Sequence, residues 1–194
     1  MLRRAVLQLA LCGAAPALAA PVGLTVLDAA GQPLADAVVA VYVAGAPAQA
    51  PAGATAELAQ RQKTFVPGVL AVQTGTAVQF PNFDTVRHHV YSFSPTKVFE
   101  IKLYAGTPAA PVVFDKPGTA VLGCNIHDRM QAFIRVVDTP HFARTDAAGR
   151  ATIDLPPGTH PAQVWHASLG IGAAPPSQPL ATAGGAATLT LKQP

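Results

Sequence analysis

Apolar and polar residues alternate in short runs along most of the chain, beginning near residue 22. Valine and threonine are frequent within these runs, and glycine, proline, asparagine and aspartate separate one run from the next. No long segment repeats its apolar residues with the period of a helix. Alternation with period two, broken by turn residues, is typical of β-strands. The sequence therefore predicts an all-β protein rather than a helical one.

The predicted strands fall into three blocks along the chain. The first block contains strands at 22–28 and 37–43, and the third begins near Thr139. The second block runs from about Gln60 to Asp138, with strands predicted at 63–66, 69–73, 76–81, 87–93, 98–103, 111–115, 119–124 and 132–138. Short strands at this spacing predict a Greek-key β-sandwich for the second block.

Segments rich in alanine, proline and glycine interrupt the pattern in two places. Residues 46–59 are predicted as a linker, and 171–185 as a loop before a last strand at 186–192. The tetrapeptide Asp-Ala-Ala-Gly occurs at 28–31 and 146–149, which we interpret as two hairpin turns of the same chemistry. The predicted organisation is a leader at 1–19, a flanking unit made of 20–45 and 139–194, the linker at 46–59 and a central domain at 60–138.

The N-terminus predicts export. Arg3 and Arg4 precede an apolar run from Ala5 to Leu11, and the small residues ending at Ala19 fit a cleavage site. We therefore expect a secretory signal peptide, cut after Ala19, and a mature protein that is periplasmic or secreted. The apolar run is too short and too interrupted to predict a membrane span, and no later segment predicts one.

Removal of the leader changes the charge and the cysteine count. The full chain has 13 Lys+Arg and 10 Asp+Glu, so loss of Arg3 and Arg4 leaves 11 against 10, or +1. This balance predicts no nucleic-acid partner, because proteins that bind nucleic acids carry a basic stripe on their surface.

Cys12 leaves with the leader, and the bulky Leu11 argues against its lipidation, so Cys124 is alone in the mature chain. A lone cysteine in an oxidising compartment suggests an intermolecular bridge, a reactive thiol or a metal ligand, and the alternative is a buried inert thiol.

Three side chains that can bind a metal share one short loop. Cys124, His127 and Met130 lie between two predicted strands, so thiolate, imidazole and thioether can converge on a single point. A further imidazole is available at His88 or His89, on a separate predicted strand. Two histidines, one cysteine and an axial methionine are the ligand set of a blue-copper electron-transfer site. Zinc is a weaker expectation, since structural zinc takes more thiolates or histidines and seldom a thioether.

These residues resemble the ligands of the cupredoxins, a family of small blue-copper proteins. The spacing Cys124-x-x-His127-x-x-Met130 is similar to the short ligand loop of amicyanin. The phrases His-His-Val-Tyr-Ser and Cys-Asn-Ile-His resemble the cupredoxin-like proteins often labelled methylamine utilisation proteins. The resemblance implies one copper ion, cycling between Cu(II) and Cu(I), held by His88, Cys124, His127 and Met130.

The identity of the upstream histidine stays open. In cupredoxins the first histidine is commonly followed by asparagine, and this pattern makes His88 the ligand and puts His89 at the asparagine position. The two side chains must point to opposite faces of a strand, so only one can reach the metal. The alternation of His89, Tyr91 and Phe93 argues instead for His89 facing inward.

The two flanking segments resemble a carboxypeptidase regulatory-like domain, a small transthyretin-like β-sandwich. Leu24–Val43 carries its opening Asp-x-x-Gly-x-Pro-Leu hairpin, and Phe142–Leu191 carries its Thr-Asp-x-x-Gly and Leu-Pro-Pro-Gly turns. The resemblance implies that a Greek-key cupredoxin β-sandwich at 60–138 is inserted into, or packed beside, this second small β-sandwich.

The expected function is single-electron transfer by an exported mononuclear copper protein that meets its redox partner protein transiently. A filled four-ligand site leaves no open position for a substrate, so the sequence predicts that the protein is not an enzyme. Two alternatives remain. One is a periplasmic copper carrier or chaperone that hands copper to a partner, and the other is a secreted binding module without redox function.

Overall fold

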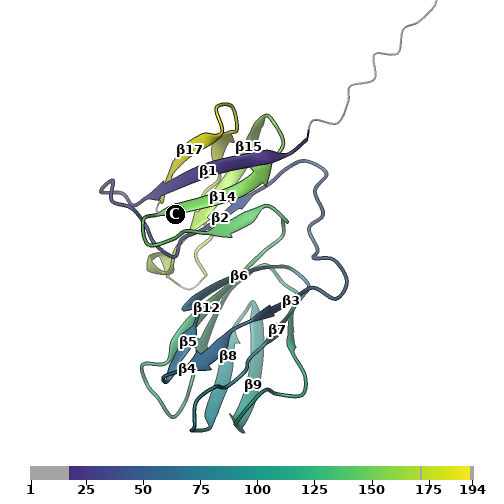
Figure 1. Ribbon diagram of the computed structural model, residues 1–194, viewed down its shortest axis with the longest axis vertical. Coiled ribbons are helices and arrows are strands. Elements are labelled where there is room, and N and C mark those ends of the chain that lie inside the picture. Colours follow the sequence, from purple (N-terminus) through teal and green to yellow (C-terminus); the bar gives the residue numbers. More distant parts are fainter. Residues whose placement is uncertain (1–17, 171, 193–194) are drawn as a thin grey trace, which may run out of the picture.

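The computed structural model describes residues 18–170 and 172–192, and β-strands make up about half of this part of the chain (Figure 1). A single turn of 3₁₀-helix, η1 (Ala167–Leu169), is the one helical element among the described residues. No helix in the described part of the chain has the length and apolar character needed to cross a membrane. The predicted leader lies almost entirely outside the described residues, and so does Cys12.

The middle of the chain folds into one β-sandwich, which we call the central sandwich. Its strands are β3 (Thr55–Glu57), β4 (Ala59–Arg61), β5 (Thr64–Val66), β6 (Val69–Gln73), β7 (Thr76–Gln79), β8 (His88–Ser94), β9 (Lys97–Tyr104), β10 (Val112–Phe114), β11 (Gly118–Gly123) and β12 (Gln131–Val137). A five-stranded sheet in the order β6-β12-β11-β8-β9 packs on a three-stranded sheet in the order β10-β7-β3, and β4 pairs with β5. Alternate apolar residues of the longer strands fill the core, as Ala132, Ile134 and Val136 of β12 do.

The segments before and after it form a second β-sandwich, the flanking sandwich. Its strands are β1 (Ala20–Leu27), β2 (Val38–Val41), β13 (Phe142–Arg144), β14 (Arg150–Leu155), β15 (Thr159–Trp165), β16 (Gln178–Ala181) and β17 (Ala186–Thr190). One sheet has the order β14-β1-β17, and the other has the order β13-β2-β15-β16. Because β1 and β2 pair with strands from the far end of the chain, the central sandwich is inserted between the two halves of the flanking one (Figure 1). The prediction of an all-β, β-sandwich fold is confirmed.

Two strands lie in segments that the sequence predicts as linker or loop. β3 falls within 46–59 and pairs in parallel with β7, and the Gln73 side chain donates to the Pro47 carbonyl at 2.7 Å to hold the preceding residues. β16 falls within 171–185 and pairs with β15 at the edge of its sheet. An edge strand leaves some amides unpaired, so Pro179 fits there although it has no N–H. Composition alone predicts loops here because these strands are defined by their pairing with β7 and β15, which composition does not reveal.

A small apolar cluster joins the two sandwiches. Trp165 of β15 is buried against Phe133 of β12, with ring centroids 5.8 Å apart, and Val38 and Val69 belong to the same cluster. Phe133 lies on the face of β12 opposite to the core residues of the central sandwich. The outer face of β12 is therefore covered by the flanking sandwich.

Candidate metal centre

Three of the predicted ligands converge at one end of the central sandwich. His88 begins β8, Cys124 follows the last residue of β11, and His127 lies in the same loop as Cys124. The Cys124 Sγ lies 3.9 Å from His88 Nδ1 and 3.8 Å from His127 Nδ1. The three ligand atoms all lie within 4.8 Å of one another. Pairing of β8 with β11 thus brings His88 beside a loop that follows it by 36 positions.

The two cysteine–histidine separations suit ligands of one metal ion. Bonds of about 2.0 Å to nitrogen and about 2.3 Å to sulfur place two ligand atoms of one ion up to roughly 4.3 Å apart. Both cysteine–histidine distances fall inside this limit. His88 is 0% and Cys124 is 4% exposed, whereas His127 is half-buried. The cluster is therefore enclosed on the side of His88 and reaches the surface at His127.

The loop between β11 and β12 supplies two of these three side chains. Residues 124–130 form two tight turns, and the Met130 amide donates to the His127 carbonyl at 2.9 Å. The Met130 side chain is 2% exposed and belongs to the same core cluster as Cys124. Met130 is thus buried at the end of the ligand loop, and its role as a fourth ligand stays a prediction.

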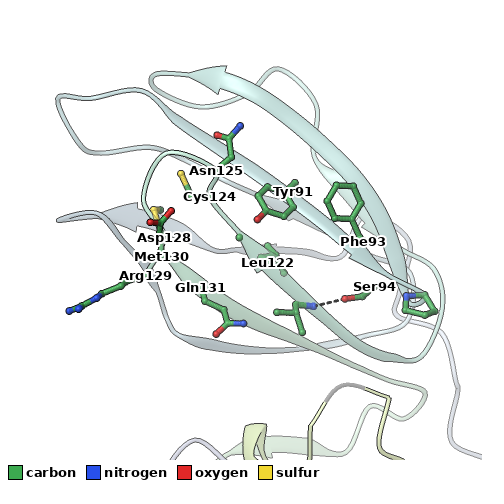
Figure 2. Close-up of a pocket in the computed structure, with 13 residues that line it drawn as sticks. Tyr91, Phe93, Ser94, Leu122, Cys124, Asn125, Asp128, Arg129, Met130 and Gln131 are labelled. Atoms are coloured by element: carbon green, nitrogen blue, oxygen red, sulfur yellow. Dashed lines mark hydrogen bonds between the residues drawn. The ribbon is translucent and has the colours of Figure 1, made fainter.

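An open groove of about 730 Å³ reaches this loop along β8 and β11 (Figure 2). Cys124 and Met130 line one end of the groove, and Figure 2 shows their sulfur atoms on the same side of the loop. Tyr91 and Phe93 line its other part, with ring centroids 5.2 Å apart. The Tyr91 ring occupies the space beside Gly123, where an added Cβ would lie 2.8 Å from it. The groove therefore runs beside the sulfur-bearing side of the loop.

Asp84 fixes the orientation of the His88 ring. Its Oδ2 lies 2.7 Å from His88 Nε2, while the other ring nitrogen faces Cys124. Desolvation acts to raise the pKa of Asp84, but hydrogen bonds from the Lys63 amide, the His88 ring and the Gln62 amide lower it overall. An ionised carboxylate only accepts, so Nε2 carries the proton and Nδ1 presents its lone pair toward Cys124. Carboxylates in such contacts orient metal-binding histidines and make them better donors.

Asp84 is itself held by the turn between β4 and β5. The amides of Gln62 and Lys63 donate to its two carboxylate oxygens at 2.6 and 2.9 Å, and its own amide donates to Asn82 Oδ1 at 2.9 Å. Gln62 and Lys63 have φ values of 52° and 59°, as the central residues of a type I′ hairpin turn require. A hairpin more than twenty residues upstream of His88 thereby stiffens the position of its ring.

His89 points away from the cluster. Its Nε2 lies 3.0 Å from Glu100 Oε1 on β9 without the geometry of a hydrogen bond, and its ring packs edge-on against Tyr91 at 5.6 Å. The structure therefore places His88, and not His89, beside Cys124. The alternation of His89, Tyr91 and Phe93 follows an aromatic row along β8, with Phe93 76% exposed at its end.

The sequence-based prediction assigns no role to Asp84, Gln62 or Lys63. The one signal in the sequence is the spacing of Asp84 four positions before His88. Such a spacing does not imply contact in an extended chain, because residues four apart in a strand lie far from each other. Contact arises here because the chain turns between Asn82 and the start of β8.

Comparison with known proteins places cupredoxins among the similar structures. No protein-family profile and no curated protein matches the chain. Among solved structures, a copper-containing nitrite reductase from Thermus scotoductus is 28% identical over 50% of this chain and 25% of that protein, with a TM-score of 0.39. A reduced variant of amicyanin is 17% identical over 50% of this chain and 97% of its own, with a TM-score of 0.39. A purple cupredoxin from Nitrosopumilus maritimus is 22% identical over 43% of this chain and 98% of its own, with a TM-score of 0.37. This chain spans a quarter of the length of the nitrite reductase.

Proposed function

We propose that this protein binds one copper ion through His88, Cys124, His127 and Met130 and transfers single electrons. The observation that carries the proposal is the meeting of one thiol with two imidazole nitrogens at 3.8 and 3.9 Å. Two imidazoles and a thiolate, with a weak axial thioether, are the donors of blue-copper electron-transfer sites. Met130, buried at the end of the ligand loop, is the candidate for the axial position.

The donor set favours copper over other common metals. Structural zinc takes four cysteine and histidine ligands, and only three such ligand atoms meet here among the described residues. Calcium and magnesium take oxygen ligands, and the three atoms that converge are sulfur and nitrogen. Thiolate and thioether are soft ligands that suit Cu(I), and imidazole suits copper in both oxidation states.

Copper held at this site would supply a one-electron couple between Cu(II) and Cu(I). The part of the protein is to keep the ligands in nearly fixed positions. His88 is braced by Asp84, and Cys124 and Met130 are anchored where β11 ends and β12 begins. Ligands that are already in place need little rearrangement when the charge changes, which favours fast electron exchange.

His127 is the ligand best suited to pass electrons to another molecule. It is half-buried, whereas His88 and Cys124 are almost fully enclosed. Ile126 beside it is 46% exposed and offers an apolar contact. A small apolar surface suits a redox partner that binds weakly and leaves quickly. With four ligands in place no position is left for a substrate, so we propose an electron carrier outside the cytoplasm rather than an enzyme.

A spectroelectrochemical titration of the copper-loaded protein tests electron transfer. We expect reversible reduction and reoxidation with a slope of about 59 mV per tenfold change in the ratio of oxidised to reduced protein, as one electron requires. The zinc-loaded protein is the control and should show no response. Loss of copper on reduction, or an irreversible reduction, would contradict the proposal.

The groove favours a second candidate, a copper carrier that hands its metal to a partner. Cys124 and Met130, 4% and 2% exposed, both line its wall, so the two sulfur-bearing residues lie directly beneath a surface that another protein can reach. Incubation of the reduced, copper-loaded protein with a Cu(I) chelator separates the two candidates. A carrier gives up its copper within minutes, whereas an electron-transfer protein keeps it and remains redox-active.

A further inference from the structure

One cation lies on the face of β12 that the flanking sandwich covers. Phe133 and Arg135 alternate with the core residues of this strand and so face the second sandwich. Arg135 is only 9% exposed. Its guanidinium lies 5.9 Å from the centroid of the Trp165 ring, and its Nη1 donates to Thr119 Oγ1 at 3.1 Å. A guanidinium is thus enclosed beside an apolar contact between the two sandwiches.

The charge of Arg135 has no partner of opposite sign in contact with it among the described residues. None of the ion pairs in the described part of the chain includes this guanidinium. Thr119 accepts from one of its five N–H groups, and an aromatic face attracts it only weakly. Burial lowers the pKa of Arg135, although Tyr42 and Asp138 act in the opposite direction. A buried cation of this kind is costly unless an anion compensates it.

Arg135 lines a cavity of about 440 Å³ between the two sandwiches. Lys116 and Thr119 line it from the central sandwich, and Tyr42 and Gln163 line it from the flanking one. The Tyr42 hydroxyl donates to Gln163 Oε1 at 3.1 Å, and burial raises the pKa of Tyr42 to about 12, so the phenol stays protonated. This volume is within the range of small-molecule sites.

The cavity lies at the opposite end of the strands from the candidate metal centre. Thr119 stands near the start of β11, and Cys124 follows its last residue. Five residues of a strand separate them by about 17 Å. Arg135 likewise lies near the end of β12, and Met130 just precedes its beginning. Occupation of the cavity is therefore independent of the proposed copper site.

We propose that this cavity binds a small oxyanion, a carboxylate or a phosphate group, through Arg135 and Lys116. The two cations outnumber Asp138, the one carboxylate in the lining, which is exposed to solvent. A guanidinium presents parallel N–H donors that match two oxygens of a carboxylate or phosphate, and the ammonium of Lys116 adds a point charge. Because both sandwiches line the cavity, the bound anion ties them together.

Trp165 allows a direct test, because it is the only tryptophan of the chain and lies beside Arg135. The fluorescence of the metal-free protein is titrated with sodium phosphate and, separately, with sodium acetate, at an ionic strength held constant with sodium chloride. We expect a saturable change with at least one of them, and the effective anion shows whether the site prefers phosphate or carboxylate. Arg135→Gln should abolish the change, and Lys116→Gln should weaken the apparent affinity about tenfold.

Lys102→Gln is the matched control, because it removes the same charge from an exposed position on β9 outside the cavity. It should leave the titration unchanged. If Arg135→Gln does not fold, Lys116→Gln decides, since Lys116 is exposed and its loss leaves the packing intact. The proposal is overturned if neither anion has an effect beyond that of chloride, or if Lys116→Gln binds as tightly as the unaltered protein. In a separate sample loaded with copper, neither anion should change the absorption spectrum of the bound copper.

Discussion

His88 uses its two ring nitrogens for different tasks. Nδ1 faces the thiol of Cys124, and Nε2 contacts the carboxylate of Asp84. The carboxylate fixes the tautomer of the ring and strengthens it as a donor. Its negative charge also favours the oxidised state of a metal at Nδ1, because that state carries one more positive charge. The reduction potential should therefore depend on a residue that does not touch the metal.

Substitution of Asp84 separates these two effects. Asp84→Asn keeps an oxygen that can accept from Nε2 but removes the charge, so we predict a reduction potential raised by roughly tens of millivolts. Asp84→Ala removes the contact, and we predict copper affinity lower by about 10–100-fold. Asp154→Asn makes the same change of charge on the flanking sandwich and should alter neither quantity. An unchanged potential in Asp84→Asn would contradict the role assigned to this carboxylate.

Matched substitutions of the two adjacent histidines test the choice between them. His88 lies in the cluster, and His89 contacts Glu100 instead. We predict that His88→Gln abolishes the visible band of bound copper and that His89→Gln retains it. Absorption spectra of both variants after addition of one equivalent of Cu(II) give the answer. The opposite result would make His89 the ligand.

The candidate ligands could be predicted from the sequence, but the contacts that hold His88 in place could not. Cys124, His127 and Met130 share one short loop, so their proximity follows from spacing alone. The contact between Asp84 and His88 depends on a turn, and the anchoring of Asp84 depends on a hairpin 21 and 22 positions earlier. No local pattern of residue types marks such contacts.

The two Asp-Ala-Ala-Gly turns form the same local structure in different surroundings. In each, the aspartate Oδ1 accepts the amides of the residues two and four positions later, at 2.8–2.9 Å. The prediction of shared turn chemistry is confirmed. Gly31 (φ 79°) has open space around it, whereas Gly149 (φ 70°) packs against the backbone of the segment around β1.

These surroundings predict different costs for the same substitution. A Cβ at Gly149 would lie 2.6 Å from the Val26 carbonyl oxygen and 2.9 Å from the Leu34 amide nitrogen. Gly149→Ala should lower the free energy of unfolding by about 2–4 kcal/mol, because a clash adds to the strain of a positive φ. Gly31→Ala should lower it by about 1 kcal/mol, from strain alone. Urea unfolding followed by circular dichroism measures both, and equal losses would contradict this packing.

The strands of the central sandwich could be predicted because apolar and polar residues alternate along them. Each of the eight strands predicted between Gln60 and Asp138 has a counterpart among β5 to β12. β3 and β16 lie in segments rich in alanine and proline, where the partner strand supplies the pairing and few side chains enter a core. Strands of that kind are not visible in the pattern of apolar residues.

Two tyrosines connect the stability of the whole molecule to pH. Tyr42 lines the cavity between the sandwiches, and Tyr104 ends β9 in the central one. Burial is the largest cause that raises the pKa of each to about 12, and the charge of Asp138 adds to it for Tyr42. The folded state therefore favours the neutral phenols more than the unfolded chain does.

Stability should accordingly fall at high pH. Tyrosines of the unfolded chain ionise near pH 10, so the contribution of Tyr42 and Tyr104 is fully present below about pH 10 and is lost as the pH rises through about 12. Urea unfolding between pH 9 and 12 measures how the free energy of unfolding falls with pH. Tyr42→Phe should make this fall less steep. An absorbance titration in which both groups of the folded protein ionise near pH 10 would contradict their burial.

The absorption spectrum of the copper-loaded protein tests the metal centre most directly. A bond between Cu(II) and the thiolate of Cys124 produces an intense visible charge-transfer band. We predict this band on addition of one equivalent of Cu(II) to the metal-free protein, and its absence in Cys124→Ser. A protein that binds Cu(II) without colour, or a band that survives Cys124→Ser, would contradict a copper site built from His88, Cys124 and His127.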